Sequence, residues 1–123
     1  MQWIRARAMP LGRISPGQGG DMQVKTSQDN GQVIIKVSGN VDTKAAEELR
    51  SELARVLQMT PTKVTMNLKM VPSIGSSGIG KILVFFKELN KRQASFEIKG
   101  IQENIHELFK AIKLDKLFPI TKA

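Results

Sequence analysis

Apolar and polar residues alternate in two short segments early in the chain. Residues 22–27 (MQVKTS) and 32–39 (QVIIKVSG) are rich in residue types typical of strands, and QDNG separates them. Asn30 and Gly31 form a dipeptide that strongly favours a two-residue turn, because both residues tolerate a positive φ. The pattern predicts an antiparallel hairpin.

Three later segments carry apolar residues at helical spacing. The first begins near Asp42 or Thr43, either of which can cap a helix, and ends at Thr60-Pro61. The second spans 76–92 and the third 101–112. The residues expected to face inward are Ala46, Leu49, Leu53, Val56 and Leu57 in the first helix, Ile79, Ile82, Leu83, Phe86 and Leu89 in the second, and Ile101, Ile105, Leu108, Phe109 and Ile112 in the third.

Short β-rich segments lie between and after these helices. They are 63–68 (KVTMNL) and 94–100 (ASFEIKG), and 114–120 (LDKLFPI) suits a helical turn followed by an edge strand. The order is β-β-α-β-α-β-α-(α)-β. Strands joined through helices lie parallel with right-handed crossovers, so the sequence predicts an α/β fold in which helices pack against a small mixed β-sheet.

The first 21 residues differ in character from the rest of the chain. They contain three arginines and two prolines, and they show neither a helical nor an alternating apolar pattern. We expect residues 1–21 to be a disordered leader or a remnant of cloning, and residues 22–123 to form one domain.

Composition restricts the classes of function. The chain has no cysteine, which excludes disulfides and thiolate sites and fits a reducing cytoplasm, and its single histidine, His106, disfavours metal and Ser-His-Asp sites. The longest apolar run, 82–86, is too short to span a bilayer, so we expect a cytoplasmic protein without membrane insertion. Residues 22–123 carry 16 basic and 10 acidic side chains, but these are interspersed without stacking aromatics, which favours solvated surfaces over nucleic-acid binding.

The segment PSIGSSGIGK (72–81) places Gly75, Gly80 and Lys81 at the spacing of a nucleotide phosphate loop. Such a loop needs a Ser or Thr hydroxyl after the lysine to hold Mg²⁺, whereas Ile82 follows Lys81 and belongs to the apolar stripe. Nucleotide binding is therefore an alternative that the pattern disfavours, and we assign no catalytic residue.

The same segment places two serines, Ser76 and Ser77, at the expected start of the second helix. Free amides and the helix dipole favour negative charge there, so a phosphoserine would be accommodated. A phosphate adds about −1.5 to −2 of charge, which would label a surface of small neutral residues for a partner. The simpler interpretation is that Ser76 only caps the helix.

Three stretches together resemble the STAS domain, the fold of anti-sigma-factor antagonists and of the cytoplasmic tails of sulfate transporters. They are SGNVDTKAAEEL, MNLKMVPSIGSSGIGKILVFFKEL and IQENIHELFKAIKLDKLFPI, and the likeness covers nearly all of 22–120. In that family a strand leads into D-S-[ST]-G-[LIV]-G, whose first serine is phosphorylated by a partner kinase. The resemblance puts Ser76 on that serine, Ser77 on the second hydroxyl position, and Gly78, Ile79 and Gly80 on the remaining positions.

A second family motif, G-[EN]-[LIV]-D, is matched by residues 39–42 (GNVD). The resemblance implies that Asp42 lies near the serine loop. One position departs from the family: the aspartate before the phosphorylated serine is Gly75 here, so a carboxylate beside the phosphate acceptor is missing.

The resemblance implies a binding module of bacterial partner switching, with no enzyme activity, cofactor or metal. Unphosphorylated, the domain would dock onto a GHKL-type serine kinase or anti-sigma factor, and phosphorylation would release it until a serine phosphatase resets it. A STAS subunit that grips the ATPase of a lipid-transport complex is the alternative. The implied partner-binding residues are Asp42, Ser73, Gly75, Gly78, Lys81, Val84, Phe85 and Glu88.

Overall fold

The computed structural model describes residues 22–122, and the expected leader, residues 1–21, lies outside them. Strands and helices follow the predicted order. The strands are β1 Gln23–Asp29, β2 Gln32–Ser38, β3 Lys63–Met70, β4 Ser95–Ile101 and β5 Ile120–Thr121, and the helices are α2 Thr43–Gln58, α3 Ser76–Lys91, α4 Glu103–Ala111 and the 3₁₀ helix η1 Leu114–Lys116.

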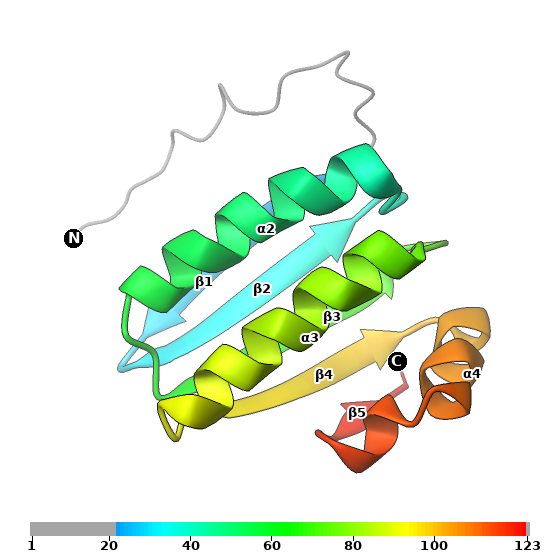
Figure 1. The fold of residues 1–123 in the computed structure, drawn as a ribbon. Coiled ribbons are helices and arrows are strands. Elements are labelled where there is room, and N and C mark those ends of the chain that lie inside the picture. The colour runs from blue at the N-terminus through cyan, green and yellow to red at the C-terminus, as the bar shows by residue number, and fades with distance from the viewer. Residues whose placement is uncertain (1–21, 123) are drawn as a thin grey trace.

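The described strands form one mixed sheet in the order β1-β2-β3-β4-β5 (Figure 1). β1 pairs antiparallel with β2, and the later neighbours pair parallel. In the turn between β1 and β2, Asn30 and Gly31 have φ values of 52° and 83°. The hairpin prediction is confirmed, because both residues adopt the left-handed conformation that a type I′ turn requires.

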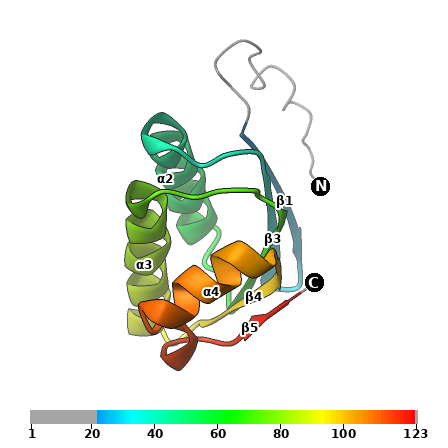
Figure 2. The same cartoon turned by 90° about the vertical axis from the view of Figure 1, so that its right-hand side faces the viewer.

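The helices lie on one face of the sheet and leave the other face open (Figure 2). Alternate residues of β2, namely Val33, Ile35 and Val37, point toward the helices and are almost fully buried. This arrangement confirms the predicted α/β fold class. Because α2 and α3 each follow a strand of the parallel part, they begin at the same sheet edge and lie side by side (Figure 1).

α2 begins where the sequence indicates. Asp42 is its N-cap, and its Oδ1 accepts a hydrogen bond of 2.9 Å from the Ala45 amide. The expected inward stripe is buried except at Leu57, which is partly exposed near the end of the helix.

α4 is shorter than predicted, because β4 continues through Ile101 and the helix begins at Glu103. Ile105 and Phe109 are buried, but Leu108 and Ile112 are 39% and 46% exposed. The prediction that Leu108 and Ile112 face inward is wrong, since this short helix buries only a narrow stripe spaced by four residues. Among residues 22–122, no helix has the length and apolar character to cross a membrane.

Candidate functional site

Two loops, residues 39–42 after β2 and 71–75 after β3, meet at the carboxyl edge of the sheet. The Val41 amide donates to the Ser73 carbonyl at 3.0 Å, and the Gly75 amide donates to the Val41 carbonyl at 3.0 Å. The Ser73 hydroxyl donates to Asn40 Oδ1 at 2.9 Å. The backbone thus fixes the turn that holds Asp42 beside the loop that leads to the serines.

Gly75 is the N-cap of α3, in place of either serine. Its backbone is extended, with φ −90° and ψ 175°, and its carbonyl accepts from the Ile79 amide at 3.1 Å. Ser76 and Ser77 are therefore the first two helical residues, which corrects the interpretation of Ser76 as the cap. The reason is the hydrogen bond of the Gly75 amide to Val41, which turns the chain into the helix one residue earlier.

The two serine side chains differ in exposure. Ser76 is exposed and Ser77 is half-buried. Neither hydroxyl has a hydrogen-bond partner within residues 22–122. Within the described residues, neither hydroxyl is therefore needed to hold the fold together, and Ser76 is the more accessible of the two.

Gly78 is buried beneath the loops, although we expected it at the partner surface. A Cβ on this residue would lie 2.7 Å from Val41 Cγ1 and 2.9 Å from Ile74 Cγ1, closer than side chains pack. Gly78 is therefore required for the close approach of α3 to the two loops, and the expectation that it is exposed on the surface is wrong.

Gly80 is different, because nothing lies within 4 Å of a Cβ placed there. Glycine inside a helix destabilises it by about 0.5–1 kcal/mol relative to alanine. The described part of the fold does not explain why glycine stands here. Its absent side chain leaves bare backbone one turn beyond Ser76.

Phe85 was expected at the partner surface, but its side chain is only 2% exposed. It packs edge-to-face on Phe96 with ring centroids 5.8 Å apart. The expectation that Phe85 is exposed is wrong, because the buried stripe of α3 consists of Gly78, Ile82, Phe85 and Leu89. Phe86 lies on the flank of this stripe, with its ring centroid 5.1 Å from that of Phe118.

Lys81 and Glu88, also expected at the surface, form ion pairs within the chain. Lys81 Nζ lies 3.2 Å from Glu47 Oε2 on α2, and the Lys81 side chain is 29% exposed. Glu88 Oε2 lies 3.4 Å from Arg92 Nε. Hydrogen bonds from Arg50 and then Lys81 hold the pKa of Glu47 below its ordinary value. Lys81 therefore links α3 to α2. Ile82 stands where a phosphate loop needs a Ser or Thr to hold Mg²⁺, and it is fully buried in the core, which disfavours nucleotide binding at this segment.

The outward face of α3 begins at Ser76 and continues through Gly80, Val84 and Lys87, which share one side of the helix at four- and three-residue steps. Val84 is 67% exposed and Lys87 is also exposed. We call these four residues the outer stripe. The sequence motifs include Gly80 but do not place it on this face, and they do not include Lys87. Helical spacing from Ser76 could have identified both as members of the outward face. Met70, 64% exposed at the end of β3, was missed because that strand is longer than predicted.

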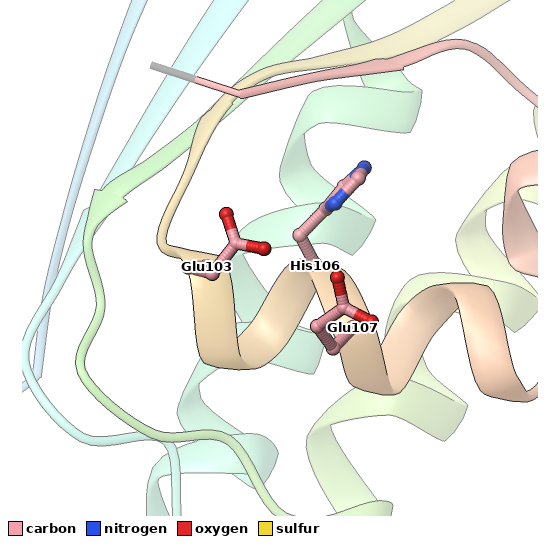
Figure 3. Close-up of side chains that lie close together, drawn as sticks. All are labelled: Glu103, His106 and Glu107. Carbon is pink, nitrogen blue, oxygen red and sulfur yellow. The ribbon is translucent and has the colours of Figure 1, made fainter.

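A separate cluster of ionisable side chains lies on α4, formed by Glu103, His106 and Glu107 (Figure 3). Lys122 Nζ lies 2.8 Å from Glu103 Oε1, and this contact, followed by one from Glu107, lowers the pKa of Glu103. His106 Nδ1 is buried without a hydrogen-bond partner among the described residues. Lys122 thus already supplies a cation to the cluster, which contains none of the predicted site residues.

The family of this chain follows from its similarity to known protein families. The sequence profile of the STAS domain matches residues 21–123. The chain belongs to the STAS family. The matched span includes both loops at the carboxyl edge and all of α3.

This STAS domain is similar to bacterial regulatory proteins. It is 24% identical to an anti-sigma F factor antagonist of Paenibacillus polymyxa over 101 aligned residues. The alignment covers 81% of this chain and 86% of that protein. An anti-sigma factor antagonist structure from Mycobacterium paratuberculosis aligns with a TM-score of 0.76 at 21% identity, covering 84% of this chain and 87% of that one. The phosphorylated form of Bacillus SpoIIAA aligns with a TM-score of 0.66 at 19% identity, covering 80% and 90%. The solved structures share the STAS fold.

Gly75→Asp, which introduces the aspartate of the STAS motif, is expected to raise the free energy of unfolding by about 0.3 kcal/mol. The φ of −90° suits any residue, and a Cβ would lie at an ordinary 3.8 Å from the Val41 carbonyl oxygen. The new carboxylate could accept from first-turn amides, whereas Gly75→Ala offers no acceptor and should be destabilising. Urea unfolding of both variants checks this, and a larger loss for aspartate than for alanine would contradict the geometry.

Proposed function

We propose that this STAS domain is a non-catalytic switch that docks an anti-sigma factor with serine-kinase activity and is released when Ser76 is phosphorylated. The observation that carries the proposal is the position of Ser76. Its hydroxyl is exposed and unbonded at the first residue of α3, at the head of the outer stripe. The similarity to named anti-sigma factor antagonists, and the existence of SpoIIAA in a phosphorylated form, support this function.

Electrostatics allow a phosphate at this position. The first turn of α3 has free amides and no acidic side chain, so negative charge is favoured there by about 0.3–1 kcal/mol. The same charge is unfavourable for docking, because the neighbouring Gly80 and Val84 present a small, apolar surface that a partner would cover. Phosphorylation therefore leaves the fold intact and changes only what the partner meets.

The chemistry belongs to the partners. A GHKL-type kinase transfers the γ-phosphoryl group of ATP to Ser76 Oγ, the hydroxyl proton passes to a base of the kinase, and ADP leaves. A serine phosphatase uses water to return the hydroxyl and release inorganic phosphate. The STAS domain contributes the acceptor and the docking surface, in the bacterial cytoplasm, and thereby regulates transcription.

The direct test is phosphorylation by the partner-switching serine kinase of the host with ATP, followed by intact-mass and peptide mass spectrometry. Wild type should gain one phosphate, Ser77→Ala should gain one as well, and Ser76→Ala should gain none while it stays bound to the kinase. No phosphate on wild type, or a phosphate lost only in Ser77→Ala, would contradict the proposal.

Gly75 favours a second candidate, because the carboxylate of the family motif is missing beside the acceptor. In this case the domain would act structurally and grip the ATPase of a lipid-transport complex through the same stripe. Purification from the host with a transporter ATPase and without any serine kinase would favour this function.

A further inference from the structure

Lys81 gives the two serines different electrostatic surroundings. Ser77 precedes Lys81 by four residues, so both side chains lie on the flank of α3 that faces α2. Three and four residues after Ser76 stand Ile79 and Gly80, neither of which carries charge. Lys87 is the next cation of the outer stripe, about 16 Å further along the helix.

We propose that Lys81 binds a phosphate placed on Ser77, whereas a phosphate on Ser76 has no cation of its own helix within one turn. This inference rests on the proposed function and deepens it. For a phosphate on Ser76, α3 itself offers its first-turn amides and no side-chain cation within one turn, so the negative charge stays on the outer stripe. A phosphate on Ser77 would be partly neutralised by the protein itself.

The present partner of Lys81 can release it at little cost. Glu47 is held through its other oxygen, since Arg50 Nε lies 3.1 Å from Oε1. The Glu47 side chain is 59% exposed, so water also solvates it when Lys81 turns away. A phosphate carries up to twice the charge of a carboxylate and lies on the same helix as Lys81, so it competes favourably for the ammonium group.

Phosphoserine encoded at position 76 or 77 tests this without any kinase. Each phosphoprotein is compared with its unmodified parent in wild-type, Lys81→Gln and Lys81→Arg backgrounds, by thermal unfolding at low ionic strength. The phosphate at position 77 should raise Tm by about 2 °C more with Lys81 than with Lys81→Gln, and Lys81→Arg should preserve the gain. The phosphate at position 76 should show no such dependence on Lys81.

Matched controls are Lys87→Gln on the outer stripe and Lys44→Gln, an exposed residue in the first turn of α2. Neither should change the effect of phosphate at position 77. Equal coupling of Lys81 to both positions, or no coupling to position 77, would overturn the inference. Because no partner enters the measurement, the proposed function can fail while this inference holds, and the reverse is also true.

Discussion

A phosphate on Ser76 is expected to weaken the complex with the proposed anti-sigma partner by at least about 100-fold, equivalent to about 2.7 kcal/mol. The outer stripe next to Ser76 has bare backbone at Gly80 and an apolar side chain at Val84. Covering this surface would strip water from the phosphate, and Lys81, already paired with Glu47, is on another flank. Isothermal titration of the partner with protein carrying encoded phosphoserine measures the loss.

The control for that measurement is phosphoserine at position 27. Ser27 is exposed on β1 and pairs with Ile34, which alternates with the buried Val33 and Ile35 and so lies on the sheet face opposite the helices. The same charge there should leave the affinity within about twofold, because it lies on the sheet face opposite the helices and salt screens exposed charges separated by more than about 10 Å. Equal losses at positions 27 and 76 would mean that net charge, and not the outer stripe, governs binding.

Gly78→Ala and Gly80→Ala are expected to change stability in opposite directions. The methyl group at position 78 would overlap Val41 and Ile74, so we expect the free energy of unfolding to fall by about 1–3 kcal/mol. The methyl group at position 80 meets open space, so it should rise by about 0.5–1 kcal/mol through helix propensity. Urea unfolding monitored by circular dichroism distinguishes the two results.

Measuring the affinity of Gly80→Ala for the partner should show whether its stability and its binding change in opposite directions. If a partner lies directly on the outer stripe, Gly80→Ala should bind about tenfold more weakly although it is the more stable protein, because the methyl group occupies the contact. Unchanged affinity in this variant would place the partner elsewhere on the domain.

The order of elements could be predicted because its signals are local. Asn30-Gly31 specifies its turn through φ preferences, and Asp42 caps α2 through an amide only three residues away. The buried face of α3 could not be predicted in this way. Residues 82–86 are all apolar, so helical spacing fits more than one face, and contacts with Phe96 and Phe118 from distant parts of the chain select among them.

At the candidate site too, some features follow from local sequence and others depend on contacts between distant segments. The resemblance predicted that Asp42 lies near the serine loop. The structure places the two loops together, because the parallel strands β2 and β3 that precede them end at the same sheet edge. The resemblance did not distinguish Gly78 from Gly80, because only the distance to Val41 and Ile74 shows that one is required for packing. The cap at Gly75 depends on a hydrogen bond across two loops, which no local pattern reports.

The most direct test of the phospho-switch is phosphopeptide mapping of the protein isolated from its native host, together with identification of the proteins that co-purify with it. We expect phosphate on Ser76 in one fraction of the molecules, and a serine kinase or anti-sigma factor bound only to the unphosphorylated fraction. Serines 76 and 77 unmodified under all growth conditions, with a transporter ATPase as the bound partner, would contradict the phospho-switch.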